Sequence, residues 1–82
     1  MTTLAQVAPR LAKAHRERQR EIEVEARKER HRQTMLLKAE RLEAHRDLQL
    51  IRAYATGDRR YIERRERKLD QARREVARWR AA

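Results

Sequence analysis

The segment Ala55-Thr56-Gly57-Asp58 decides the fold, because it contains the only glycine and separates two long helical patterns. Glycine adopts the left-handed conformation without steric cost, so Gly57 can end one helix at its C-terminus. The carboxylate of Asp58 can then cap the free N–H groups of a second helix. Thr56 is an alternative cap, which would shift the boundary by a residue or two. The segment therefore predicts a turn at 56–58 between two helices.

The composition favours an extended helical protein over one with an enclosed core. The 82 residues include 23 Lys and Arg against 13 Asp and Glu, which gives a net charge of +10, and there is no Phe. Leu, Ala, Arg and Glu are good helix formers, and the few apolar residues recur at helical spacing. We therefore expect an all-α fold. The positive charge predicts attraction to nucleic acid, anionic lipid or an acidic protein surface.

The absence of cysteine excludes disulfides and thiolate metal sites. The N-terminus lacks the apolar core of a signal peptide, and no apolar stretch is long enough to span a bilayer. These features predict a cytoplasmic protein.

Residues 1–12 are expected to form an N-terminal arm or a short helix. Thr3 and Gln6 fit a capping box, in which each side chain satisfies a backbone donor of the other. Pro9 lacks an N–H group and clashes with the preceding turn. We therefore expect a kink or break at Ala8-Pro9, with the helix restarting at Pro9.

Residues 13–55 are predicted to form one long helix with two different sections. Section 13–34 is highly charged, with 8 Lys or Arg and 5 Glu, and Glu23 to Arg27 is a favourable i,i+4 pair. Such a stretch is typical of a solvated helix. Section 35–55 is more apolar, with a stripe at 3–4 spacing that consists of Leu37, Ala44, Leu48, Ile51 and Ala55, with Arg41 at the remaining position.

The apolar face of section 35–55 is wider than one narrow stripe. It also includes Met35, Leu36, Ala39, Leu42, Leu50 and Tyr54. A face this broad can contact two neighbours, which we expect to be the second helix and a second copy of the chain.

The second helix is predicted over 59–82, where Ile62, Leu69, Ala72, Val76 and Trp79 repeat at heptad-like positions. Folding back at Gly57 brings the apolar patterns of the two helices together. It places Ile62 near Ile51, Leu69 near Ala44, Val76 near Leu37, and Trp79 near Met35 and Leu36.

This agreement predicts a long antiparallel helical hairpin, similar to a coiled coil. A two-helix hairpin alone is marginally stable, so we expect a homodimer, as a four-helix bundle. The residues assigned to the hairpin or dimer seam are Leu37, Leu48, Ile51, Ile62, Leu69, Val76 and Trp79.

Arginines recur on the outer face of the second helix, away from this seam. Arginine offers forked donors suited to phosphate and carboxylate oxygens, and residues 58–82 hold 10 basic and 5 acidic residues. A solubilising exterior is the alternative explanation. The candidate partner-binding residues are Arg60, Arg64, Arg67, Arg74 and Arg78.

Catalytic and cofactor sites find no support in the sequence. His15, His31 and His45 are scattered without paired ligand spacing, and no Glu-x-x-His motif of carboxylate bundles occurs. There is no Gly-rich phosphate loop and no nucleophile-and-base arrangement. We therefore expect no enzyme activity, no cofactor and no metal.

The run Ala55-Thr56-Gly57-Asp58-Arg59-Arg60-Tyr61-Ile62-Glu63-Arg64-Arg65, followed by Lys68-Leu69 and Ala72, resembles small helical proteins of bacterial temperate phages and mobile elements. The resemblance covers about a third of the chain. It implies a bacterial cytoplasmic setting and an accessory or regulatory role, often through binding a host protein.

Three functions remain open at this point. The leading hypothesis is a protein-interaction module that dimerises and binds an acidic partner, as an inhibitor or adaptor. The second is a nucleic-acid-binding accessory protein that uses the same arginines on phosphates. The third is a coiled-coil spacer, in which the charged section 13–34 would be the working part.

Overall fold

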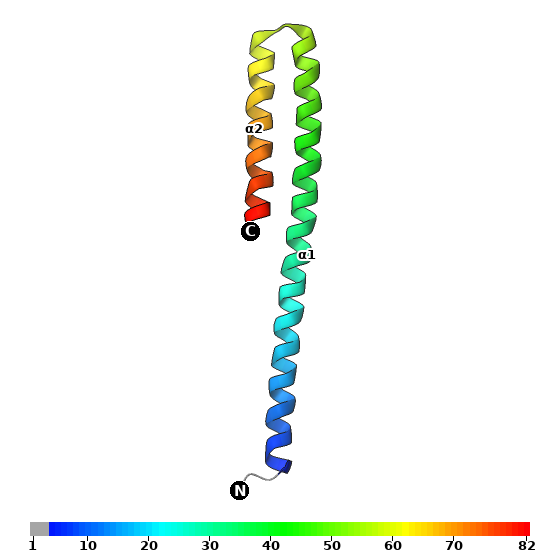
Figure 1. The fold of residues 1–82 in the computed structure, drawn as a ribbon, viewed down its shortest axis with the longest axis vertical. Coiled ribbons are helices and arrows are strands. Elements are labelled where there is room, and N and C mark those ends of the chain that lie inside the picture. Colours follow the sequence, from blue (N-terminus) through cyan, green and yellow to red (C-terminus); the bar gives the residue numbers. More distant parts are fainter. Residues whose placement is uncertain (1–3) are drawn as a thin grey trace. The chain divides into compact units, whose positions relative to one another are not determined.

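A computed structural model describes residues 4–82, with side chains from Val7 onward. The described residues form two helices, α1 (Leu4–Thr56) and α2 (Arg59–Ala81), and no strand (Figure 1). The chain divides into two structural units, Met1–Arg30 and His31–Ala82. The predicted all-α class is therefore confirmed for the described part of the chain.

The turn between the helices has the predicted geometry. Gly57 has φ = 68°, in the left-handed region, and its N–H donates to the carbonyl of Tyr54 at 3.3 Å. Asp58 is the N-cap of α2, and its Oδ1 accepts hydrogen bonds from the N–H groups of Arg60 and Tyr61. The hydroxyl of Thr56 instead donates to the carbonyl of Ala53 at 2.6 Å, so Thr56 belongs to the last turn of α1.

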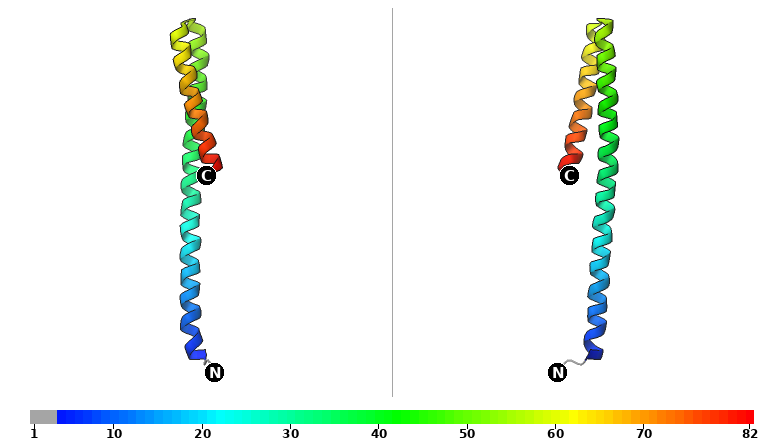
Figure 2. Two further views of the ribbon diagram at one scale, coloured as in Figure 1. Left: turned by 90° about the vertical axis from the view of Figure 1, so that its left-hand side faces the viewer. Right: turned by 45° about the vertical axis from the view of Figure 1, so that its right-hand side comes forward.

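The unit His31–Ala82 is an antiparallel hairpin, as predicted. α2 runs beside the C-terminal part of α1 in every view (Figures 1 and 2). Near the turn, the Tyr54 hydroxyl donates to Glu66 at 2.9 Å. Farther from the turn, Arg80 forms an ion pair with Glu40 at 3.4 Å. Cross-helix bonds therefore occur over most of the length of α2.

The two buried residues on the α1 side of the hairpin seam are both alanines. Ala39 and Ala53 are buried, and they face an α2 surface whose buried residues are Leu69, Ala72 and Val76. Methyl side chains let two helix backbones approach closely, so the larger residues of α2 fill the space between them. The seam positions of α1 recur at 3–4 spacing as 36, 39, 43, 46, 50 and 53.

The α1 residues that the sequence pattern places against α2 are not those that the hairpin buries, and their role at a dimer seam stays a prediction. Leu37, Leu48 and Ile51 are 48%, 45% and 59% exposed, so they do not lie between the two helices. Of the two buried α1 residues, Ala39 belongs to the wider part of the predicted apolar face, whereas Ala53 belongs to neither predicted set. Ala39 lies 18 residues before Gly57 and Val76 lies 19 residues after it, so these two buried residues share a level of the hairpin.

On the α2 side of the hairpin seam, the residues that the structure buries are those that the sequence pattern predicts. Leu69 and Val76 are buried, and Ile62 and Trp79 are half-buried. The Trp79 ring lies edge-on to the His31 ring, with the ring centroids 5.8 Å apart. The Arg32 guanidinium donates to the carbonyl of Trp79 at 3.2 Å.

The unit Met1–Arg30 contributes the first part of α1. Arg27 forms the predicted i,i+4 ion pair with Glu23, at 3.8 Å, and residues 8–30 are exposed. The helix begins at Leu4 and includes Pro9, so Pro9 lies inside the helix and does not restart it. Because proline has no N–H group, α1 lacks one backbone hydrogen bond at this position, near its N-terminus. The predicted capping box involves Thr3 and the Gln6 side chain, which lie outside the described residues.

Candidate protein-binding surfaces

The outer face of α2 carries a continuous arginine ridge. Its members are Arg60, Arg64, Arg67, Arg74 and Arg78, with Gln71 at the one intervening position. Residues three and four apart share one face of a helix, and all five arginines are exposed. No acidic residue interrupts the row. At 1.5 Å per residue, the ridge extends over about 27 Å.

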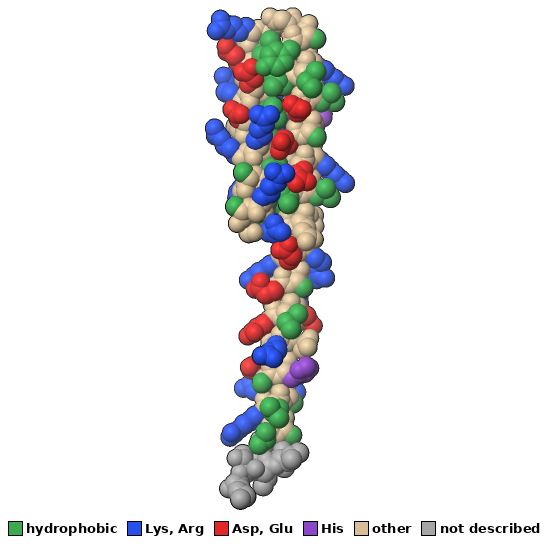
Figure 3. Space-filling model, in the orientation of Figure 1, with side chains coloured by type: hydrophobic (Ala, Val, Ile, Leu, Met, Phe, Trp, Pro, Cys, Tyr) green, Lys and Arg blue, Asp and Glu red, His purple; other side chains and the backbone are tan. Residues whose placement is uncertain are grey.

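The ridge faces solvent because the opposite side of α2 is held in the seam. The residues on that opposite face are at most 3% exposed: Leu69, Ala72 and Val76. In sequence they alternate with the ridge residues, but helical spacing places them on the other side of α2. Figure 3 shows Lys and Arg side chains projecting from the α2 side of the hairpin. The fold therefore orients the ridge away from α1.

Four ridge arginines have no side-chain hydrogen bond or ion pair with any described residue: Arg60, Arg64, Arg67 and Arg74. Arg78 is 3.8 Å from Glu75 and stacks on the Trp79 ring. Some of the other α2 arginines bond to α1 across the hairpin. Arg65 donates to Gln49 at 3.1 Å, for example. Four unpaired guanidinium groups therefore share one face of α2.

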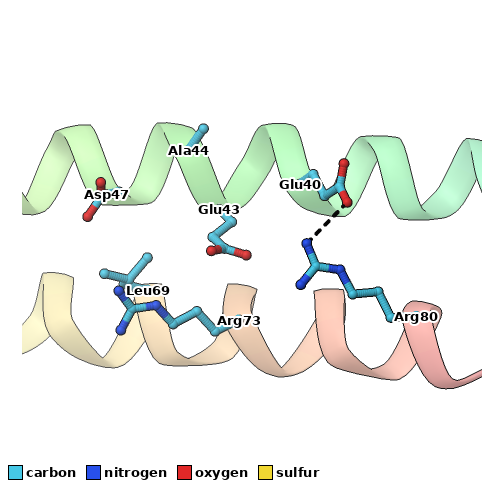
Figure 4. Close-up of a pocket in the computed structure, with 7 residues that line it drawn as sticks. All are labelled: Glu40, Glu43, Ala44, Asp47, Leu69, Arg73 and Arg80. Carbon is cyan, nitrogen blue, oxygen red and sulfur yellow. Dashed lines mark hydrogen bonds and ion pairs between the residues drawn. The ribbon is translucent and has the colours of Figure 1, made fainter.

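A charged groove follows one side of the hairpin, where both helices contribute (Figure 4). It has a volume of about 380 Å³, and its lining includes the acidic residues Glu40, Glu43 and Asp47. The Arg73 and Arg80 side chains reach into it from α2, and Arg80 pairs with Glu40. Its acidic groups are therefore partly balanced from within the chain.

The residues that the sequence assigns to the α1 seam form an exposed outer stripe. This outer stripe consists of Leu37, Arg41, Ala44, Leu48, Ile51 and Ala55. It lies on the side of α1 opposite the hairpin seam, because its members are displaced by about half a turn from Ala39 and Ala53. In Figure 4, Ala44 points away from α2.

Several residues that build the hairpin are missing from the sequence-based assignment. Ala39 and Ala53 are the buried residues of α1, and Gln49 accepts hydrogen bonds from both Arg46 and Arg65. The signal for them is a second 3–4 repeat through positions 36, 39, 43, 46, 50 and 53. It is weak in sequence because positions 43 and 46 are Glu43 and Arg46.

The described residues contain no group of three or more His, Asp or Glu side chains arranged to hold a metal ion. None of the helices within residues 4–82 is long and apolar enough to cross a membrane. Comparison with protein families, curated proteins and solved structures finds no match for this chain.

Proposed function

We propose that this chain is a non-enzymatic helical interaction module that forms a homodimer and binds an acidic partner protein through the arginine ridge. In this proposal it regulates or inhibits a host protein in the bacterial cytoplasm, which is the setting that the resemblance to phage and mobile-element proteins implies. The proposal requires no cofactor or metal.

The observation that carries the proposal is the row of four unpaired guanidinium groups on one helix face. An arginine that forms no bond within its own chain retains its donors for a partner, and carboxylates match its forked geometry. A surface that served only solubility would have no need to separate basic from acidic residues. The ridge contains no acidic member, whereas the charged groove between the two helices mixes both signs.

Phosphate binding is the second candidate, because the same guanidinium groups match phosphate oxygens. The aromatic residues give it little further support. Trp79 is half-buried against His31, and the Tyr54 hydroxyl is bonded to Glu66. Neither ring is free on the ridge to stack on bases. We therefore favour a carboxylate-bearing protein surface.

Pull-down from a bacterial lysate tests the proposal, with and without nuclease. The ridge variant changes Arg60, Arg64, Arg67, Arg74 and Arg78 to Gln, which lowers the net charge from +10 to +5. A matched control changes Arg10, Arg16, Arg18, Arg20 and Arg27 to Gln, with the same change of net charge. Gln keeps a high helix propensity, so both variants should remain helical by circular dichroism.

We expect an acidic partner that survives nuclease, is retained by the control variant and is lost by the ridge variant. Partners that disappear with nuclease would support the phosphate-binding alternative instead. Equal capture by the ridge variant and the parent would show that the ridge is a solubilising exterior.

A further inference from the structure

The outer stripe of α1 is an apolar surface that the hairpin leaves uncovered. Leu48 is 45% exposed and Ile51 is 59% exposed, although both lie in the part of α1 that α2 runs beside. The members of the outer stripe repeat at alternating spacings of four and three residues, which is the pattern of a coiled-coil seam. In heptad terms, Arg41, Leu48 and Ala55 occupy a positions, and Leu37, Ala44 and Ile51 occupy d positions.

The two flanks of the outer stripe carry opposite charge. The g positions on one flank are Glu40, Asp47 and Tyr54, of which two are acidic. The e positions on the other flank are Lys38, His45 and Arg52, of which Lys38 and Arg52 are positively charged. Asp47 and Arg52 form no ion pair within the described residues, so both are available to a partner.

This separation of charge distinguishes the two ways in which a second copy can dock. In an antiparallel pair, each flank meets the same flank of the other helix, so Asp47 would face acidic groups and Arg52 basic groups. In a parallel pair, a g residue lies beside the e residue five positions later in the other helix. Glu40 then faces His45 of the second copy, and Asp47 faces Arg52.

We infer that the outer stripe binds the same stripe of a second copy of this chain, in parallel orientation. This inference rests on the proposed homodimer and identifies its surface and direction. Leu37, Leu48 and Ile51 supply the apolar layers of the interface. Arg41 meets its own copy at one layer, where its long side chain can extend to the solvated edge of the interface. A single polar layer of this kind weakens association but fixes register.

The position of the outer stripe also sets the arrangement of the four helices. Because the stripe and the hairpin seam lie on opposite sides of α1, the two copies of α1 meet in the centre and each α2 lies outside. The order is α2, α1, α1, α2 in a row, in place of a compact four-helix bundle. The arginine ridges then face away from the dimer on both outer sides and stay accessible to a partner.

Disulfide trapping tests the orientation directly, because the chain has no cysteine of its own. Leu37→Cys and Ala55→Cys place one thiol near each end of the outer stripe, 18 residues or about 27 Å apart along the helix. A disulfide requires Cα atoms about 4.4–6.8 Å apart. Gln71→Cys, on the ridge, is the matched control at an exposed helical position on the outer face of α2.

We expect Leu37→Cys alone and Ala55→Cys alone each to give covalent dimers on mild oxidation, while Gln71→Cys does not. A mixture of the two stripe variants should give no mixed disulfide. A mixed disulfide without the two single-variant products would show an antiparallel dimer and overturn the inference. Preferential linkage through Gln71→Cys would assign the dimer contact to α2, with the same consequence.

Sedimentation equilibrium of the parent chain separates failure of this inference from failure of the proposed homodimer. A monomer would overturn both, whereas a dimer with the wrong linkage pattern overturns only the inference. Leu48→Gln should raise the dissociation constant without loss of helicity, because Leu48 makes no part of the hairpin seam.

Exchanging the charges of Asp47 and Arg52 is a second test of whether the two copies of α1 are parallel. Asp47→Arg or Arg52→Asp alone should weaken dimerisation roughly 2- to 30-fold, because each removes two symmetry-related exposed pairs. The double variant, Asp47→Arg with Arg52→Asp, should restore the affinity of the dimer, because the two charges again face opposite charges. Failure of the double variant to recover, with helicity retained, would contradict the parallel pairing.

Discussion

The hydroxyl of Tyr54 donates a hydrogen bond of 2.9 Å to Oε1 of Glu66, which joins the last turns of α1 to the start of α2. This bond raises the pKa of Tyr54 above its ordinary value of 10.0, with smaller contributions from desolvation and from the charge of Glu66. It is the polar contact between the helices closest to Gly57 in the described residues.

Tyr54 therefore makes hairpin stability depend on pH in the alkaline range. A raised pKa means that the folded state binds the phenolic proton more tightly than the unfolded state does. This contribution is fully present below pH 10 and is lost as the pH rises through the folded pKa. Tyr54→Phe should flatten the fall of the unfolding midpoint above pH 10, measured by circular dichroism. Tyr61→Phe is the control, and an equal flattening in both variants would contradict the role of Tyr54.

Trp79→Ala should destabilise the end of the hairpin that is distant from the turn. The indole contacts the His31 ring edge-on, and its Nε1 donates to Glu75 at 2.9 Å. Because Trp79 is only half-buried, we expect a loss of about 2 kcal/mol, below the roughly 3–5 kcal/mol of a fully buried aromatic residue. Thermal unfolding measures the loss, and Trp79→Phe should keep part of the stability. An unchanged midpoint in Trp79→Ala would show that this contact does not hold α2.

Gly57→Ala should destabilise the turn by about 1–2 kcal/mol, through backbone conformation alone. A Cβ atom at Gly57 would meet no atom within 4 Å, so steric overlap adds nothing to the cost of φ = 68°. Asn tolerates the left-handed region better than Ala, so Gly57→Asn should lose less. Urea unfolding of the three chains measures the difference. Equal stability of the Ala and Asn variants would mean that the turn changes its conformation on substitution.

Binding to duplex DNA should be weak and steeply dependent on salt. Contacts between the arginine ridge and phosphates would each contribute about −0.9 to the slope of log affinity against log salt. We expect fluorescence anisotropy to detect binding only at low salt, and the ridge-to-Gln variant to flatten the slope. The matched control variant should retain more of this salt dependence; it changes Arg10, Arg16, Arg18, Arg20 and Arg27 to Gln. Tight, sequence-selective binding at physiological salt would make the nucleic-acid function the correct one.

The turn and the α2 side of the hairpin could be predicted from sequence because each depends on local chemistry. Gly57 is the only residue that enters the left-handed region without strain, and Asp58 directly follows it. In α2, one 3–4 repeat dominates, so the buried Leu69 and Val76 could be assigned from spacing alone. The arginine ridge follows from the same repeat, because it occupies the opposite face of the helix.

The sequence by itself thus determined two helices, their antiparallel return at Gly57 and the inward face of α2. Only the tertiary structure decided which face of α1 meets α2. Section 35–55 has two overlapping 3–4 repeats, and hydrophobicity favours the one with Leu37, Leu48 and Ile51. The hairpin uses the other, because Ala39 and Ala53 let the backbones approach and Gln49 accepts hydrogen bonds from Arg46 and Arg65. Close packing and polar pairing depend on both helices at once, so no single-helix pattern reveals them.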